Sequence, residues 1–156
     1  MLKKLLAAVV GAIAFAVPAA NASPALASAC QPYSATGHDA ATSPAGPYVG
    51  VENVTIGKTT YSNVSAVTSI LAPLTAEGDS GVFTTTTSHA ISLPSGTITT
   101  TDNVHLIPTQ TPGVYKLVSH LVITGGASGE LQLQGTVNFG TLSAEGTFVG
   151  TVCGLS

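Results

Sequence analysis

The fold of this chain is decided by residues 81–153, which begin GVFTTTTSHAISLPSGTITTTDNVHLI (residues 81–107). Short segments rich in Thr and Val follow one another here, with Gly and Pro breaks between them. That pattern is typical of antiparallel β-structure. The apolar spacing of an amphipathic helix does not persist in any window, and β-branched residues dominate. We therefore predict an all-β protein.

Seven strand candidates follow one another along the chain, and an eighth is indicated near Tyr33. The seven lie at residues 48–56, 60–71, 82–93, 97–107, 114–124, 130–139 and 145–153. Short breaks join them, so neighbours in the sequence should be neighbours in the sheet. An open meander would leave two unpaired edges that favour aggregation, and closure removes them. We predict an antiparallel meander closed into a barrel of about eight strands, with a two-sheet β-sandwich as the alternative.

The N-terminus has the order of a secretory signal peptide. Lys3 and Lys4 precede an apolar run over residues 5–17, and Pro18 and small residues follow it. The run is shorter than the roughly 20 residues that a membrane-spanning helix needs. We expect a signal peptide over residues 1–22, cleaved after Ala22, with residues 25–27 as a second cleavage site and residues 27–30 as a weaker lipoprotein-like one. The protein should be secreted, to the extracellular space or to the periplasm or cell envelope.

Removal of residues 1–22 leaves about 134 residues, which suffice for one domain with a real core. Residues 23–47 are rich in Ala, Ser, Pro and Gly, so we expect an extended lead-in there and a barrel domain over residues 48–156. The chain has no Arg, and residues 23–156 contain Lys58 and Lys116 against seven acidic residues. This balance argues against nucleic acids and anionic membrane surfaces as partners.

Two cysteines, Cys30 and Cys153, stand near the two ends of the expected mature chain. In a chain addressed to an oxidising compartment they should form one structural disulfide. Neither cysteine has a Cys or His at metal-ligand spacing, and the four histidines are also too scattered for a metal site. We expect no metal and no other cofactor.

Strand alternation predicts which side chains point into the barrel, because residues two apart share a face. The inward sets of three successive strands should be Phe83, Thr85, Thr87, His89, Ile91 and Leu93; Ile98, Thr100, Asp102, Val104 and Leu106; and Tyr115, Leu117, Ser119, Leu121 and Ile123.

The two hairpin turns between these strands set the expected register. If Leu93 pairs with Ile98, His89 lies opposite Asp102. If Leu106 pairs with Tyr115, Asp102 lies opposite Ser119, and the three polar residues form one inward-facing row.

His89, Asp102 and Ser119 are therefore the candidate catalytic residues. A carboxylate beside an imidazole favours the charged ring and fixes its tautomer, which suits general acid or base chemistry on a small molecule. The alternative is structural, since buried polar groups commonly satisfy one another across strands. Serine-hydrolase chemistry is disfavoured because Ser119 sits mid-strand, without the exposed turn and oxyanion donors that a nucleophilic serine needs.

A second segment carries a family resemblance. Residues 121–129 read LVITGGASG, and Leu131, Leu133, Gly135, Val137 and Phe139 alternate after them. This arrangement resembles the bacterial secreted relatives of the allene oxide cyclase and dirigent barrels, over roughly the second half of the chain. The resemblance implies a barrel closed by the final strand and allows a cofactor-free cyclase or isomerase. None of the cyclase's catalytic residues can be placed on this sequence.

We predict a barrel that binds a small apolar or amphipathic ligand, with Phe83, Leu106, Tyr115 and Leu117 at the ligand. A pocket with few convergent polar groups binds rather than transforms, so an enzyme is the less favoured reading. The alternatives are a cofactor-independent cyclase or isomerase, and a structural or interaction protein of the cell envelope. Assembly as a homo-oligomer is compatible with the sequence, and no membrane insertion is expected after signal removal.

Overall fold

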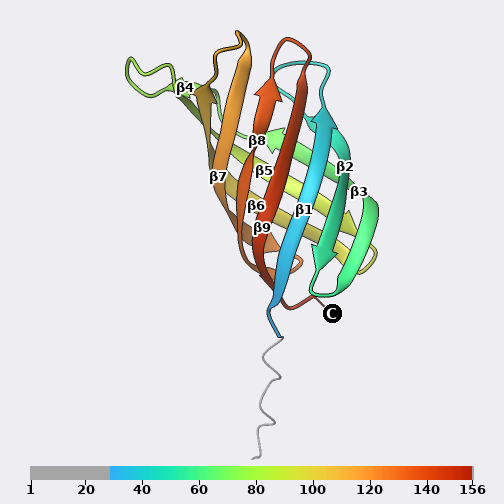
Figure 1. Ribbon diagram of the computed structural model, residues 1–156. Helices are drawn as coiled ribbons and strands as arrows, with labels where there is room; N and C mark the ends of the chain where they lie inside the picture. Colours follow the sequence, from blue (N-terminus) through green and yellow to red (C-terminus); the bar gives the residue numbers. More distant parts are fainter. Residues whose placement is uncertain (1–28, 156) are drawn as a thin grey trace, which may run out of the picture.

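The computed structural model describes residues 29–155, and every regular element within them is a β-strand (Figure 1). The predicted signal peptide, residues 1–22, lies outside the described residues. The strands are β1 (Gln31–Ala40), β2 (Tyr48–Ile56), β3 (Thr59–Ile70), β4 (Thr75–Ala76), β5 (Phe83–Leu93), β6 (Gly96–Pro108), β7 (Val114–Gly125), β8 (Ser128–Asn138) and β9 (Ser143–Cys153).

Eight of these strands form a closed antiparallel ring. Each strand pairs with its sequence neighbour apart from β4, and β9 pairs back with β1. The β3–β5 ladder, from Ser65 opposite Ser92 to Ile70 opposite Thr87, completes the ring. β4 pairs with the start of β5 and lies outside the ring. The predicted barrel is confirmed, and the sandwich alternative is wrong.

The seven predicted strands correspond to β2, β3 and β5 to β9, with ends displaced by no more than two residues. The eighth strand indicated near Tyr33 is β1. It lies within residues 23–47, where an extended lead-in was expected, and pairs with both β2 and β9. The barrel therefore begins earlier than predicted. The sequence did not reveal this start, because the inward side chains of β1 include Ala35 and Gly37, which are too small to indicate an apolar face.

The interior contains two apolar clusters with a polar layer between them. The lower cluster, at the end of the barrel where the C-terminus lies (Figure 1), includes Tyr33, Val54, Ile91, Ile98, Leu121, Leu131, Phe148 and Val152. The upper cluster is built on Tyr48, Val104, Leu106 and Val137. Between them the buried polar residues are Glu52, Thr85, Thr87, His89, Thr100, Asp102 and Ser119.

The inward faces predicted for β5, β6 and β7 are confirmed, but both predicted registers are wrong. Ile91 lies opposite Ile98, because Pro94 and Ser95 alone form the turn and Leu93 pairs with Gly96. In the next hairpin, Leu106 lies opposite Leu117 and Tyr115 lies opposite Pro108, because β6 continues further than expected. Each pairing shifts by an even number of residues, so every side chain keeps its predicted face.

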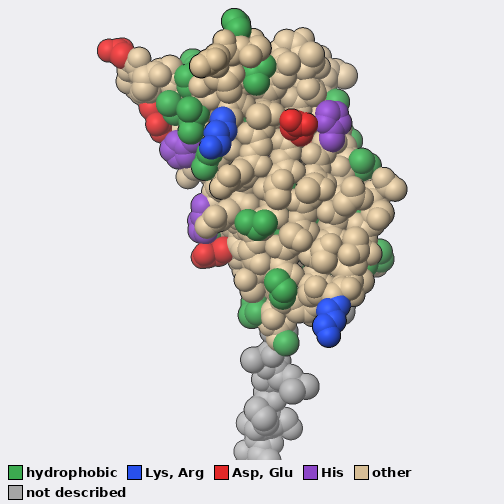
Figure 2. Space-filling view, viewed as in Figure 1, with side chains coloured by type: hydrophobic (Ala, Val, Ile, Leu, Met, Phe, Trp, Pro, Cys, Tyr) green, Lys and Arg blue, Asp and Glu red, His purple; other side chains and the backbone are tan. Residues whose placement is uncertain are grey.

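The outer surface carries few charges. In Figure 2 small polar side chains and backbone cover most of the visible face, with isolated charged groups among them. Within the described part of the chain there is no helix with the length and hydrophobicity that a membrane span requires.

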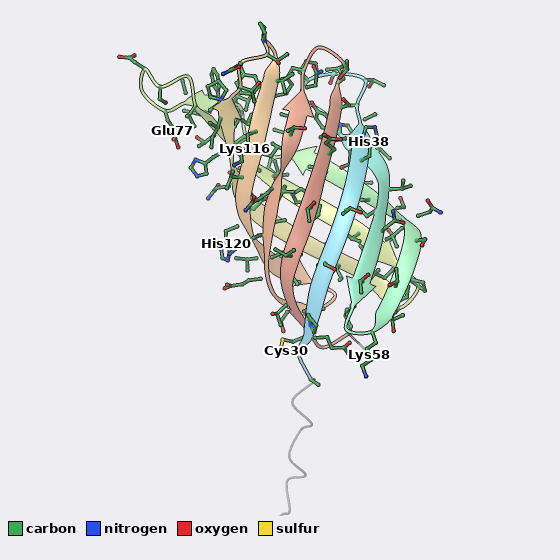
Figure 3. All side chains as sticks on the ribbon, viewed as in Figure 1. Cys30, His38, Lys58, Glu77, Lys116 and His120 are labelled. Atoms are coloured by element: carbon green, nitrogen blue, oxygen red, sulfur yellow. A yellow bond between two sulfur atoms is a disulfide. The ribbon has the colours of Figure 1, made fainter. Side chains whose placement is uncertain are left out.

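The Cys30–Cys153 disulfide is present, as predicted. It flanks the β1–β9 ladder, in which Gln31 lies opposite Val152, and Figure 3 places Cys30 at the lower end of the barrel. This ladder joins the first and last strands of the chain. Its formation therefore closes a long loop, which costs conformational entropy. A covalent link across 123 residues removes much of that entropy from the unfolded chain.

Replacement of both cysteines, in a Cys30→Ser/Cys153→Ser variant, should lower the free energy of unfolding by about 4–5 kcal/mol, the loop-entropy value for a closure of this length. Urea unfolding followed by far-UV circular dichroism measures the change. Wild-type protein kept in reductant is the matched control and should behave like the variant. A loss below about 1 kcal/mol would show that the ladder alone holds the chain ends together.

Candidate functional site

A pocket opens at the upper end of the barrel, where the β1–β2 and β8–β9 turns lie (Figure 1). It has about 80 Å³ of space for water-sized molecules. Its walls are largely apolar and include Leu106, Leu117, Val137 and Phe139. Leu74, from the connection between β3 and β5, also lines it.

Two of the four predicted ligand contacts line this pocket. Leu106 and Leu117 face it directly. Phe83 and Tyr115 pack instead on the upper apolar cluster, where their rings meet edge to face with centroids 6.0 Å apart. They therefore support the wall rather than form it.

His89, Asp102 and Ser119 are brought together, as their inward positions predicted. The His89 Nε2 atom lies 3.4 Å from Asp102 Oδ1, and the Ser119 hydroxyl donates to Asp102 Oδ2. The contacts are diagonal, because Asp102 is directly opposite Thr87 and Leu121. Of the three, only His89 lines the pocket, so Asp102 and Ser119 support the imidazole from behind.

Asp102 is the best-satisfied buried carboxylate of the polar layer. Burial by itself would raise its pKa, but hydrogen bonds from His89, Ser119 and Thr87 and the nearby imidazole charge outweigh burial and lower the pKa below its ordinary value. The Thr87 hydroxyl donates to Asp102 Oδ1 over 2.5 Å. Asp102 is therefore an anion that orients the ring of His89.

The other side of His89 connects to a second carboxylate. The Thr68 hydroxyl donates to Asp39 Oδ2 at 3.2 Å and lies 2.9 Å from His89 Nδ1. A hydroxyl has one hydrogen, so while Thr68 donates to Asp39 it accepts from the ring. If Asp39 is protonated instead, Thr68 can reverse and donate to the ring. A proton can thus pass between Asp39 and His89 through Thr68.

Glu52 lies on the inward face of β2 and lines the pocket with only 2% of its surface exposed. Its Oε2 atom has no hydrogen-bond partner in the protein. Burial, reinforced by the nearby charge of Asp39, raises the pKa of Glu52 to about 7. This carboxyl therefore changes charge near neutral pH.

Asp39 and Glu52 each lie opposite a glycine. In the β1–β2 ladder Glu52 pairs with Gly37, and Asp39 pairs with Gly50. A Cβ on Gly37 would lie 2.8 Å from Glu52 Cγ, and one on Gly50 would collide with the His38 backbone and the Asp39 carboxylate. The glycines leave the space in which both acidic side chains lie.

Burial also raises the pKa of Asp39, although the Thr68 hydrogen bond and the charges of His89 and His38 offset part of that effect. Its Oδ1 atom has no protein partner, and neither does the hydroxyl of Tyr48, which is 5% exposed and also lines the pocket. The pocket lining therefore includes two carboxyls, one phenol and one imidazole.

Asp39 and Glu52 were missed from the sequence. The alternation of Tyr48, Val54 and Ile56 within the correctly predicted strand could have placed Glu52 inward. Asp39 gave a weaker signal, because β1 has few large inward residues.

The remaining histidines with a described partner lie outside the barrel. His105 is 3.4 Å from Glu77, and His120 is 3.1 Å from Glu130, both at exposed positions. Figure 3 shows His120 and Glu77 pointing away from the barrel wall. Among residues 29–155, no three His, Cys, Asp or Glu side chains are placed to share a metal ion.

The raised pKa of Glu52 makes stability depend on pH. The folded state binds this proton more tightly than the unfolded chain, whose carboxyl titrates near 4.5. The associated stability is therefore complete below pH 4.5 and is lost as the pH rises to about 7. Between pH 5 and pH 8 the free energy of unfolding should fall by about 2–3 kcal/mol through this group.

Glu52→Gln should remove that component, so urea unfolding at pH 5 and pH 8 should give a flatter profile than wild type. The raised pKa of Asp39 also makes the free energy of unfolding fall as the pH rises. Asp102, with its lowered pKa, affects the free energy of unfolding only in more acidic solution. Glu130→Gln, on the exposed face of β8, is the control and should keep the wild-type slope. Equal slopes for wild type and Glu52→Gln would contradict a buried, proton-binding Glu52.

Comparisons of the chain with models of protein families, with curated proteins and with solved structures found no match. What the pocket can bind therefore follows from its own side chains. These combine a largely apolar lining with the acidic groups of Asp39 and Glu52.

Proposed function

We propose that this protein binds a small amphipathic molecule inside its barrel. The supporting observation is the mixed lining of the pocket: Leu106, Leu117 and Val137 are apolar, whereas Asp39, Glu52 and His89 supply polar groups. Pockets that combine an apolar lining with a few convergent polar groups are the usual sites of small ligands. The apolar body would lie against the apolar side chains, and the polar end would reach Asp39 and Glu52.

The size of the pocket limits the ligand. Its volume of about 80 Å³ is below the roughly 300–1,000 Å³ of typical ligand sites. Eight-stranded barrels have a lumen that side chains fill or that holds one small ligand. The ligand is therefore short, or inserts one end while the rest lies at the mouth.

The same proposal includes export from the cell. The disulfide between Cys30 and Cys153 is compatible with an oxidising compartment, and residues 1–22 have the order of a signal peptide. A secreted binding protein would meet its ligand outside the cytoplasm.

A cofactor-free isomerase or cyclase is the second candidate, and Glu52 is the observation that favours it. A general acid or base works best when its pKa lies near the working pH, and the pKa of Glu52 is about 7. The Asp39–Thr68–His89 contacts add a path for a second proton. The resemblance to the allene oxide cyclase and dirigent barrels is an analogy of fold that allows this chemistry.

A pocket-filling substitution tests the binding proposal. Ala144 lines the pocket on β9, whereas Ala40 is exposed on the neighbouring strand β1. Ala144→Leu should therefore abolish the added ligand mass in native mass spectra of protein made in its own host. Ala40→Leu, the matched control, should retain it. Wild-type protein that carries no added mass, and gains none from a host extract, would overturn the binding proposal.

Turnover tests the second candidate. Wild-type protein incubated with the molecule identified by native mass spectrometry should convert it to an isomer of equal mass, detected by chromatography. Glu52→Gln should slow this conversion about 100-fold, the lower end of the usual contribution of an acid–base group, and Glu130→Gln should not. A ligand recovered unchanged from wild-type protein would leave binding as the function.

A further inference from the structure

We propose that the polar end of the bound molecule is a primary amine, held as an ammonium ion by Asp39 and Glu52. This inference rests on the proposed binding function and names the chemical class of its ligand. Two unpartnered carboxyl oxygen atoms carry it, Asp39 Oδ1 and Glu52 Oε2. The two carboxyls lie close enough for the charge of Asp39 to act on Glu52.

These atoms belong to residues that line the pocket. Glu52 is 2% exposed, and both Asp39 and Glu52 are lining residues. They come from the paired strands β1 and β2, where Gly37 and Gly50 leave space for the two acidic side chains. A buried polar atom without a partner costs free energy, so two such carboxyl oxygens in one pocket indicate a ligand that supplies donors.

The charges around the pocket select a cation. Asp39, Glu52 and Glu145 line it, and His89 is the one basic side chain among the described lining residues. His89 already contacts Asp102 and Thr68. Figure 3 shows Lys58 and Lys116 pointing away from the barrel. The charges of His89 and His38 act on the half-buried Asp39. Among the described residues no basic side chain forms an ion pair with Glu52, and a buried carboxylate is stabilised by such a partner.

An ammonium group fits this arrangement better than other common polar ends. It has three donors and one positive charge, so it can donate to both unpartnered carboxyl oxygens and offset their negative charge. A hydroxyl supplies a single donor and no charge, and a carboxylate would be repelled by Asp39 and Glu52. The burial that raises the pKa of both acids would be offset by an ammonium ion beside them.

The test compares polar ends on one short chain. Wild-type protein, unfolded in urea and refolded with its disulfide intact to remove bound molecules, is titrated calorimetrically at pH 7.5 with hexylamine, hexanol and hexanoate. Hexylamine should bind about tenfold or more tightly than hexanol, because charge-assisted hydrogen bonds replace neutral ones. Hexanoate should bind most weakly.

Neutral substitutions of the two acids test whether these residues cause the preference for hexylamine. In Asp39→Asn/Glu52→Gln, and to a smaller extent in Glu52→Gln alone, the advantage of hexylamine over hexanol should fall to about twofold or less. Glu130→Gln should keep the wild-type ratio. Circular dichroism confirms that each variant is folded before titration.

Two outcomes would overturn the amine inference in different ways. Hexanol or hexanoate binding as tightly as hexylamine, or an amine preference unchanged in the double variant, would refute the ammonium site and leave the binding proposal standing. No binding of any of the three, together with protein from its own host that carries no added mass, would refute both.

Discussion

The pairing of β3 with β5 is the constraint on which the rest of the molecule depends. It turns a sheet that would have two edges into a ring, and a ring of eight strands has a narrow lumen. Every inward side chain must then fit a fixed space. Large aliphatic residues fill the lower half, while β1 and β9 contribute Gly37, Ala144 and Gly146 toward the upper half, all of which line the pocket. The position of the pocket is thus a consequence of residue size along the strands.

The polar side chains of the interior form two groups, one whose atoms have hydrogen-bond partners and one that keeps atoms without partners. Asp102 receives hydrogen bonds from three side chains and fixes the ring of His89, which is what a structural or positioning carboxylate does. Asp39 and Glu52, on the other side of the lumen, keep oxygen atoms without partners. The predicted group of His89, Asp102 and Ser119 therefore exists as a contact network, whereas the carboxyl oxygens without partners lie on β1 and β2. His89 belongs to both groups, because it connects them.

Strand alternation made the fold and much of the interior predictable. A period of two fixes which face a side chain occupies, and an error of two residues in a hairpin leaves that face unchanged. For this reason His89 and Asp102 meet although Ile98 pairs with Ile91 rather than Leu93. The turn lengths were not predictable from composition alone, since Pro94 and Ser95 suffice to reverse the chain. Asp39 was not predicted for a different reason. Beyond Tyr33, the inward face of β1 consists of Ala35 and Gly37 before Asp39, and such small residues do not indicate a buried face until the partner strands are known.

The reciprocal placement of glycines and acids in the β1–β2 ladder corresponds to a recognisable sequence pattern. Gly37-His38-Asp39 and Gly50-Val51-Glu52 are two Gly-x-acid triplets on antiparallel strands, so each glycine faces the acid of the other triplet. Such a pair is a compact signature. Genome searches weighted on these two triplets, rather than on the Thr-rich exterior, would retrieve chains that share the acidic lumen even after their outer faces have diverged.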